Sequence, residues 1–412
     1  MRATNMRATP PAPRRGTQCR VSLGRPLETA GDTPPERKVL DIRGLIAHEW
    51  VEARGGSERV AAAIADAFEH TDFVVPWNNA PERLRGHVVR ESWLAGSRLR
   101  NHKALSALVL PAVWRSLVPK DAEYDWVIAS SHLFSHHVRL RGVSRHQPKF
   151  VYVHSPARYI WNPELDPRGA SILARAVSVL LKPIDRMRAG EARSIAANSN
   201  YVRDRVLRAW HRDAIVIHPP VDVDRIAAVA DWRDRLADSE REVFDALPQT
   251  FLLGASRFVA YKQLDVVVRA GEAAGAPVVL AGGGPERATL AALARRASVP
   301  VVIVDEPSDA MLYALYQRAA VFVFPAVEDF GMMPVEAMAA GTPVVANAVG
   351  GARESVVPGV SGVLLNAFDD ASLARAVEEA RTLDPQRIRE HATKFSVDVF
   401  QSRIREWVRD AA

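Results

Sequence analysis

The chain has 412 residues, 48% of them hydrophobic, with a formal net charge of +6 and a single cysteine. This length exceeds one ordinary domain, so we expect two hydrophobic cores. One cysteine excludes a disulfide framework, no apolar run of the sequence reaches membrane-spanning length, and none of the usual nucleic-acid-binding modules appears. We therefore expect a cytoplasmic protein that binds no nucleic acid.

The first part of the chain alternates between predicted strands and helices. Residues 1–36 are rich in proline and arginine without apolar periodicity, which predicts a disordered extension. A short strand at 38–42 and a long loop over 44–56 should follow, and Ser57 should cap a helix over Glu58–Phe68. Further strands are expected at 126–129, 150–153 and 194–197. Alternation of this kind predicts a Rossmann-like parallel-sheet domain over 37–222.

Within this domain, the segment 81–120 is strongly basic. It carries eight cationic side chains and two acidic ones, interleaved with apolar residues such as Trp93, Leu105 and Leu108. Basic and aromatic residues mixed at roughly helical spacing suit an anionic membrane surface, and would place the protein on the inner face of the cell membrane. A solvated helix pair with ordinary core contacts explains the same pattern equally well.

A second α/β series begins after a proline-rich turn at 216–224. Its predicted strands are followed in most cases by a helix, as at 264–274 and 311–320, which indicates a second parallel-sheet domain over 223–395. An amphipathic helix within 396–412 should pack back on the first domain. Two such domains in tandem form a ligand crevice at the carboxyl edges of their sheets. The second-domain strands are expected at 251–255, 277–281, 300–304, 321–324 and 343–346.

Two carboxylates mark the most informative part of the second domain. Glu328 follows an apolar strand, and Glu336 lies in the first turn of the next predicted helix. The backbone N–H groups of Phe330, Gly331 and Met332 lie at the positive end of that helix, where an anion or a sugar hydroxyl can bind. This combination suits a polyhydroxylated ligand that carries phosphate.

Cationic and glycine-rich loops follow the earlier strands of the second domain. Arg257 and Lys262 come after its first strand, and such a pair can neutralise a departing diphosphate. Two ordinary surface cations are the alternative. Gly283 and Gly284 end the second strand, but their spacing is not that of a dinucleotide-binding loop, so they are weak evidence alone.

The first domain offers two further candidates for the same crevice. Gly55, Gly56 and Ser57 stand at a helix start, where backbone amides can approach a phosphate closely; a plain flexible loop is equally compatible. His154 follows a predicted strand, so its imidazole should point into the crevice rather than serve a structural role.

Together these motifs resemble the retaining glycosyltransferases of family 4, which adopt the two-domain GT-B fold. The resemblance covers nearly the whole chain after residue 37, and its most specific part is the Glu-x7-Glu element formed by Glu328 and Glu336. Other matching runs occur at 55–59, 256–262, 282–285 and 340–345. Within the family, the runs at 130–132, 154–161, 197–199 and 219–222 are most similar to bacterial mannosyltransferases of polysaccharide and lipopolysaccharide assembly.

The resemblance implies separate roles for these residues. Glu328 would hold the hydroxyls of the donor sugar, and Glu336 those of the nucleotide ribose. Arg257 and Lys262 would bind the diphosphate with help from Gly56, and His154 would touch the donor sugar near the acceptor. In this family the acceptor hydroxyl attacks on the leaving-group side and the departing phosphate takes its proton. No protein base and no cofactor or metal ion is then expected, although Asp222 and Asp224 look superficially like a metal-binding pair.

The implied function is transfer of a hexose, most simply mannose from GDP-mannose, to a lipid-linked or polysaccharide acceptor. A UDP-sugar or another GDP-sugar is the alternative donor. A hypothesis of another class is a non-catalytic partner subunit with the same fold, which the presence of all the donor-site residues disfavours. A nicotinamide-dependent oxidoreductase is disfavoured by the glycine spacing.

Overall fold

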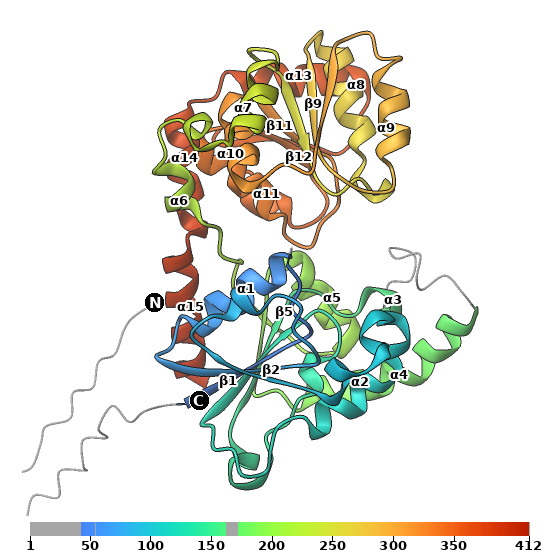
Figure 1. Cartoon of the computed structure of the whole chain (residues 1–412), viewed down its shortest axis with the longest axis vertical. Coiled ribbons are helices and arrows are strands. Elements are labelled where there is room, and N and C mark those ends of the chain that lie inside the picture. The colour runs from blue at the N-terminus through green and yellow to red at the C-terminus, as the bar shows by residue number, and fades with distance from the viewer. Residues whose placement is uncertain (1–42, 54, 162–171, 412) are drawn as a thin grey trace, which may run out of the picture. The chain divides into compact units, whose positions relative to one another are not determined.

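The computed structural model describes residues 43–53, 55–161 and 172–411 (Figure 1). The extension predicted over 1–36 and the strand predicted at 38–42 lie outside these ranges. The first described strand is β1, Arg43–His48, where a loop was expected, so that prediction was wrong. Residues 44–48 are buried and pair with strands on both sides, which a solvated loop would not do.

The first sheet is wholly parallel and has seven strands in the order β3-β2-β1-β4-β5-β6-β7. Besides β1, three of these strands were not predicted, namely β2, β3 and β7. The polar start of β2, with Thr71 and Asp72, obscures the apolar pattern. The remaining bounds are β2 His70–Val75, β3 Val88–Glu91, β4 Trp126–Ser131, β5 Lys149–Val153, β6 Ser194–Ala197 and β7 Ile215–Val216.

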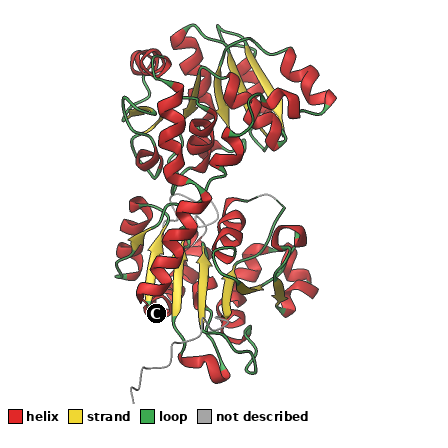
Figure 2. Cartoon of the chain, turned by 90° about the vertical axis from the view of Figure 1, so that its left-hand side faces the viewer, coloured by secondary structure: helices red, strands yellow, loops and turns green. Residues whose placement is uncertain are grey.

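Helices cover both faces of this sheet, as a buried parallel sheet requires (Figure 2). Leu45 and Ala47 of β1 pack on one face with α2, α4 and α5, and Ile46 packs on the other face with α1. This strict alternation follows from the two-residue period of a strand. The helices are α1 Gly56–Ala65, α2 Lys103–Ser116, α3 Arg158–Trp161, α4 Ile172–Gly190 and α5 Asn200–Trp210, with short 3-10 turns at Ser135–His137 (η4) and Gly142–His146 (η5).

Helix α1 starts two residues earlier than predicted. Gly55 is the N-cap residue and Ser57 lies inside the helix, so the predicted serine cap was wrong. The Ser57 hydroxyl instead donates to Glu58 Oε2 at 3.0 Å. This arrangement leaves the first backbone N–H groups of α1 without a side-chain cap.

The second sheet is also wholly parallel, with six strands in the order β10-β9-β8-β11-β12-β13. The five predicted strands are all present, each within a residue or two of its predicted bounds. The last strand, β13, was not predicted. The bounds are β8 Leu252–Ala255, β9 Val278–Gly282, β10 Val301–Asp305, β11 Val321–Phe324, β12 Val344–Asn347 and β13 Gly362–Leu365.

Helices also cover both faces of the second sheet. Phe322 and Phe324 of β11 pack on the face that holds α10 and α11, and Val321 and Val323 pack against α8 and α13. The helices of this part are α6 Val223–Ala227, α7 Asp238–Asp245, α8 Leu264–Ala274, α9 Arg287–Ala294, α10 Asp309–Arg318, α11 Met332–Ala340, α12 Ala352–Ser355, α13 Asp370–Arg381 and α14 Pro385–Ala392.

The last helix, α15 (Val397–Ala411), belongs to the core of the first sheet. Its buried residues Phe400, Ile404 and Trp407 recur at helical spacing and pack beside Phe150 and Tyr152 of β5. The Trp407 indole N–H donates to Ser194 Oγ at 2.8 Å. An apolar stripe of this kind accounts for the docking of a terminal helix.

Both sheets share the strand order in which the direction of connection reverses beside the first strand. The reversal falls between β1 and β4 in the first sheet, and between β8 and β11 in the second. Ligands of open parallel sheets bind outside the carboxyl ends of the strands at this point, because neighbouring loops there diverge and leave a crevice. The fold therefore directs attention to the loops after these four strands.

Among the helices of the described ranges, none is long and apolar enough to cross a membrane.

Candidate active site

A cavity of about 280 Å³ lies where the loops after β4, β5, β8 and β11 meet helix α1. Both acidic residues of the Glu-x7-Glu element reach it, together with the predicted Lys262 and His154. Its full lining is Ser57, Arg59, Val60, His132, His154, Asn198, Pro219, Lys262, Phe324, Glu328, Asp329, Phe330, Gly331, Met332, Met333 and Glu336.

Lys262 and Glu328 form an ion pair inside this cavity. The Lys262 ammonium donates to Glu328 Oε1, and both side chains are mostly buried. Lys262 comes from the loop after β8, and Glu328 from the loop after β11. The pair therefore lies at the switch point of the second sheet, which is the place between β8 and β11 where the direction of connection reverses. A cation and a carboxylate at this place can bind a phosphate and a sugar hydroxyl respectively.

Arg257 lies elsewhere. Its guanidinium is exposed and donates to the Tyr261 hydroxyl at 2.9 Å, and it is not part of the cavity lining. The structure thus brings only one of the two predicted cations to Glu328.

Glu336 is buried on the side of α11 that faces the cavity. Because α11 begins at Met332, Glu336 lies in its second turn, one turn later than predicted. Its Oε1 accepts a hydrogen bond from Arg59 Nη1 of α1 at 3.2 Å, and its Oε2 accepts one from the Tyr316 hydroxyl at 3.5 Å. Burial raises the pKa of Glu336, although the Arg59 guanidinium opposes this shift.

The turn between β11 and α11 is held in place by contacts from several elements. Asp329 accepts hydrogen bonds from Arg158 Nη2 and Arg205 Nη1, each at 2.5 Å. The Gly351 N–H donates to the Glu328 carbonyl at 2.8 Å, and a Cβ on Gly351 would come within 2.2 Å of the Asp329 carbonyl oxygen. Close backbone contact therefore requires glycine at 351 and fixes the loop that carries Glu328.

Gly331 is the N-cap residue of α11 and has a positive φ of 87°. A residue with a β-carbon would be strained in this conformation, so glycine suits the position. The turn lines the cavity with Phe330, Gly331 and Met332, the three residues whose N–H groups were predicted to face a ligand. A helix N-terminus supplies partial positive charge at that point.

A chain of hydrogen bonds positions His154. Its Nε2 lies 2.8 Å from Ser130 Oγ, which in turn lies 3.1 Å from His48 Nδ1. Burial, together with the neighbouring His132 and His48 rings, holds the pKa of His154 well below its usual value. His154 is therefore neutral near pH 7 and can act as a hydrogen-bond partner, while a charged imidazolium is disfavoured.

The glycines of the first domain lie close to the α11 turn. Gly56 opens α1, and a Cβ built on it would come within 2.3 Å of the Met332 side chain. A Cβ on Gly55 would come within 2.0 Å of the Glu58 carboxylate. Ser57 lines the cavity. Both contacts are with the far ends of flexible side chains, which can move, so they do not by themselves require glycine at 55 or 56.

Gly283 and Gly284 pack against the backbone of the loop that carries Lys262. The Gly283 carbonyl accepts a hydrogen bond from the Phe258 N–H at 2.8 Å, and a Cβ on Gly284 would come within 2.6 Å of the Phe258 carbonyl oxygen. Neither residue lines the cavity. The structure therefore assigns them a supporting role for the neighbouring loop, which the sequence pattern did not reveal.

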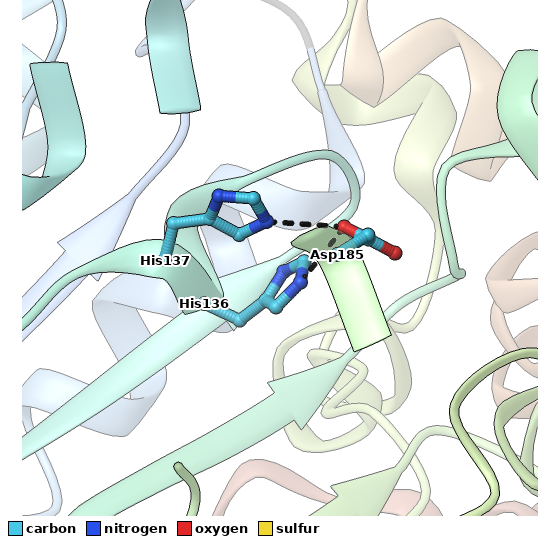
Figure 3. A group of neighbouring side chains, drawn as sticks. All are labelled: His136, His137 and Asp185. Carbon is cyan, nitrogen blue, oxygen red and sulfur yellow. Dashed lines mark hydrogen bonds and ion pairs between the residues drawn. The ribbon is translucent and has the colours of Figure 1, made fainter. Parts of the chain in front are cut away.

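One buried cluster has a donor set that a metal ion could use: His136, His137 and Asp185, shown in Figure 3. Hydrogen bonds already account for the Asp185 carboxylate. Its Oδ2 accepts from the indole N–H groups of Trp161 and Trp210, each at 2.7 Å. Its Oδ1 lies 3.1 Å from His137 Nε2 and 3.0 Å from His136 Nε2.

We interpret this cluster as a caged carboxylate, because the N–H groups of Trp161, Trp210 and His137 can solvate the buried charge. His136 Nε2 lies close to the same carboxylate but has no hydrogen-bond partner among the described residues. Trp161 ends the segment that begins at His154, so the cage also anchors that segment to α4 and α5. The cage thereby supports the position of the cavity wall.

The roles of Arg59 and Asp329, two charged residues of the cavity lining, escaped the sequence analysis. Arg59 lies in a motif that was quoted without a role for it, and its contact with Glu336 joins residues 277 positions apart. Asp329 stands beside Glu328, but only the long-range contacts with Arg158 and Arg205 reveal its function as an anchor. A basic residue within a glycine-rich helix start was the one signal available for Arg59.

The second part of the chain matches a known family model. Residues 238–395 match the family described as "Glycosyl transferases group 1", and they contain both members of the Glu-x7-Glu element. These residues form the second sheet with most of its helices. The similarity to this glycosyltransferase family is therefore confined to residues 238–395.

Curated relatives match over half of this chain or less. D-inositol 3-phosphate glycosyltransferase of Mycolicibacterium smegmatis is 34% identical over 196 residues, which are 44% of each chain. GDP-mannose-dependent alpha-(1-6)-phosphatidylinositol monomannoside mannosyltransferase of the same organism is 32% identical over 206 residues, 46% of this chain and 53% of that protein. The chain spans about half the length of the curated relatives it matches.

Solved structures resemble almost the whole chain. Sucrose-phosphate synthase from Thermosynechococcus elongatus aligns with a TM-score of 0.67 at 21% identity, over 89% of this chain and 99% of that one. Anabaena HepE in complex with UDP aligns with a TM-score of 0.64 at 19% identity, over the same shares. At such identities the likeness shows the fold, and it confirms two parallel-sheet domains of the GT-B kind.

The caged carboxylate predicts a pH dependence of stability. Burial lowers the pKa of His137 to about 4, from 6.5 in an unperturbed imidazole. Between these values the unfolded chain binds a proton that the folded chain excludes, so stability is lost as the pH falls through this window. We expect the free energy of urea unfolding to drop from about pH 7 to about pH 5, and His137→Gln to make that drop smaller.

The buried residues His48 and His154, whose pKa values are also lowered, should retain part of the pH dependence in the variant. For each protein we therefore compare the change in the free energy of unfolding between the two pH values. A loss of stability that is the same at both pH values then cancels. An identical drop in both proteins would contradict the assignment of His137 as neutral in the fold.

Proposed function

We propose that this protein is a retaining glycosyltransferase that moves a hexose from a nucleoside-diphosphate sugar to an acceptor hydroxyl. The observation that carries the proposal is the convergence of Lys262, Glu328 and Glu336 on one cavity at the switch point of the second sheet. The glycosyltransferase group 1 match over 238–395 supports it, because that range holds all three residues.

In this proposal the diphosphate lies beside Lys262 and the α11 N-terminus. The bond between the anomeric carbon and the diphosphate oxygen breaks, and a bond between that carbon and the acceptor oxygen forms on the same face. The acceptor proton passes to the departing phosphate oxygen. Negative charge grows on that oxygen during the step, and Lys262 and the partial charge of the helix end stabilise it there.

The two carboxylates have separate binding roles in the proposal. Glu328 accepts hydrogen bonds from the sugar hydroxyls, in exchange for part of its contact with Lys262. Glu336 accepts hydrogen bonds from the ribose, in exchange for its contact with Arg59. Both roles require acceptors rather than acids. The pKa of Glu336 is raised because burial removes water from its carboxylate. In the proposal, the ribose hydroxyls of the bound donor replace part of that lost hydration.

Neutral His154 would donate a hydrogen bond to the sugar beside the attacking hydroxyl. If the Ser130 hydroxyl donates to His154 Nε2, the proton of the ring stands on Nδ1, where it can reach the ligand. Arg257 would turn from Tyr261 toward the diphosphate when the donor binds. These two assignments describe the contacts that we propose for the complex of the chain with its sugar donor.

We favour GDP-mannose as the donor. The support is the likeness of the sequence to bacterial mannosyltransferases and the name of one relative, which is GDP-mannose-dependent. A UDP-sugar is the second candidate, because a structural neighbour was solved in complex with UDP. The proposed acceptor is a lipid-linked or polysaccharide glycan, and we expect no metal ion to be required.

The first prediction concerns catalysis. We expect Glu336→Ala and Lys262→Ala each to lower the rate of sugar transfer on the order of 10²-fold, because each removes a group that binds the donor or the leaving group. Product formation from a panel of nucleotide sugars and extracted lipid-linked acceptors measures the rate. Thermal unfolding should still show one cooperative transition for both variants.

Glu378→Ala and Lys394→Ala are matched controls, since both residues are exposed and lie outside the cavity. Both control variants should transfer sugar at the rate of the unaltered protein. Near-normal turnover in both cavity variants would overturn the site assignment. Donor binding without any transfer, by the unaltered protein on every acceptor tried, would favour the non-catalytic partner subunit.

The second prediction concerns the base of the donor. Isothermal titration with GDP, UDP and ADP should give the tightest binding for GDP, and Glu336→Ala should weaken that binding because the ribose loses its acceptor. Tight binding of UDP alone would replace GDP-mannose by a UDP-sugar in the proposal. The same titration into Lys262→Ala reports whether the diphosphate meets this cation.

The third prediction concerns the membrane. Within the basic segment 81–120, the side chains of Trp93, Leu105 and Leu108 are 62%, 54% and 54% exposed, and the neighbouring Arg98 and Arg100 are exposed as well. We propose that this surface binds an anionic bilayer. Flotation with phosphatidylglycerol vesicles should weaken between about 0.1 M and about 0.5 M salt, because screening shortens the reach of the charges.

Charge reversal at Arg98 and Arg100 should abolish flotation at low salt. The same reversal at Arg375 and Arg381, two exposed residues of α13, is the control and should leave flotation unchanged. Flotation that does not respond to salt would contradict an electrostatic membrane contact and leave the solvated-surface explanation of the segment.

A further inference from the structure

A second and larger cavity, of about 760 Å³, lies at the amino-terminal edge of the first sheet. Its wall includes the starts of β4 and β5, whereas the candidate active site adjoins the ends of the same strands. Because β5 has five residues, the two edges are about 13 Å apart along that strand. The cavity is therefore separate from the donor site.

The wall of this cavity is strongly cationic. Seven arginine and lysine residues line it, and Glu191 is the one acidic residue of the lining. The cationic residues come from the end of α2, from the η5 segment, and from the starts of β5 and β6. They are Arg115, Lys120, Arg139, Arg141, Arg145, Lys149 and Arg193.

Glu191 cannot neutralise this wall, because its carboxylate is already shared by three cations. Its oxygens lie 2.6 Å from Arg115, 3.0 Å from Lys149 and 2.7 Å from Arg188. Burial raises the pKa of Glu191, but these cations outweigh it and bring the pKa to about 2. The carboxylate is therefore ionised at neutral pH, and its negative charge is already shared among these three cations.

The other cations of the wall have no acidic partner within the described part of the chain. Arg141 donates to the carbonyls of Ser116 and Val118, and Arg145 donates to His146 Nε2 at 2.8 Å. No ion pair within the described ranges involves Lys120 or Arg139. Like charges held in one hollow repel each other, so their assembly costs stability unless an anion binds there.

The wall is built from tightly packed segments rather than from loose surface side chains. Gly142 has a φ of 59°, and a Cβ on it would come within 1.7 Å of the Lys120 carbonyl oxygen. Only glycine lets the η5 segment approach the end of α2 this closely. Buried Lys149 forms the floor, held by the carbonyls of His136, Val138 and Arg188.

We propose that this cavity is a binding site for an anion that carries two or more phosphate groups. Guanidinium groups bind phosphate oxygens through paired, charge-assisted hydrogen bonds, and several of them around one hollow favour a multiply charged ligand over a single carboxylate. The ligand is either a soluble phosphorylated compound or the phosphorylated headgroup of a lipid, which share this chemistry.

The test compares ligand binding by the full chain and by variants. Arg139 and Arg145 are exposed, line the cavity and lie outside the candidate active site, so Arg139→Glu with Arg145→Glu should leave the fold and sugar transfer intact. Isothermal titration with inorganic tripolyphosphate should give saturable binding by the unaltered chain. The double variant should bind at least about tenfold more weakly, since it replaces two attractions by two repulsions.

The control is the double reversal Arg375→Glu with Arg381→Glu on α13, which changes the net charge equally at exposed positions of the second domain. It should bind tripolyphosphate as the unaltered chain does. Lys262→Ala, which removes the cation of the candidate active site that does not line the second cavity, should leave the binding of tripolyphosphate in the second cavity unchanged, which separates the two sites.

A second arm distinguishes the source of the phosphate. Vesicles containing cardiolipin, a lipid whose headgroup carries two phosphate groups, are floated with the protein in a background of Arg98→Glu and Arg100→Glu, which removes the membrane contact proposed above. Flotation that depends on Arg139 and Arg145 would assign the site to a lipid headgroup, and titration alone would assign it to a soluble ligand. The proposal is overturned if neither ligand binds, or if binding is equal in the unaltered chain and in the cavity variant.

Discussion

The arrangement of this protein depends on one constraint: a parallel sheet must be buried on both faces. Each connection between parallel strands has to cross over a face, so helices cover the sheets and the strand ends remain for loops. Strand β1 shows this directly, with Leu45 and Ile46 packed into different cores. Every group that we assign to the donor lies on a loop or helix start beyond a carboxyl end of a strand, because no other edge offers diverging loops.

The same constraint explains why the candidate site consists of pairs from distant parts of the chain. Lys262 and Glu328 follow β8 and β11, the neighbouring strands at which the second sheet reverses its direction of connection. Ser130 and His48 end β4 and β1, which hold the equivalent place in the first sheet, and they position His154. Each group is held by a partner whose place the topology fixes, so the site is organised before a ligand binds.

Opposite edges of the first sheet have different chemistry. The carboxyl edge gathers neutral histidines and hydroxyls near a cavity whose acidic residues each have a cationic partner. The amino edge gathers seven cations around the single carboxylate of Glu191, and burial lowers the pKa of one of them, Lys149, to about 8. A sugar donor suits the first environment and a polyphosphate the second, so one sheet can serve two unlike ligands without competition between them.

The sequence by itself determined the class of fold and the element that defines the candidate site. Apolar strands such as Val321–Phe324 are so uniform that their burial on both faces could be predicted, and the loop residues beside them followed by position alone. Strand β2, which starts with polar residues, was missed. Asp72 of β2, for example, accepts hydrogen bonds from Arg43 and Tyr124, and such a partner cannot be seen in a local pattern.

Only the tertiary structure decided which side chains meet. In the folded chain Lys262 forms an ion pair with Glu328, whereas Arg257, five residues earlier, donates to Tyr261. Arg59 donates a hydrogen bond to Glu336. The tertiary structure also showed that Gly283 and Gly284 support a neighbouring loop, and it gathered the cations of the second cavity from four separate elements. Periodicity records which face of an element is buried, but ion pairs form between residues far apart in the chain, and only the folded chain brings them within reach.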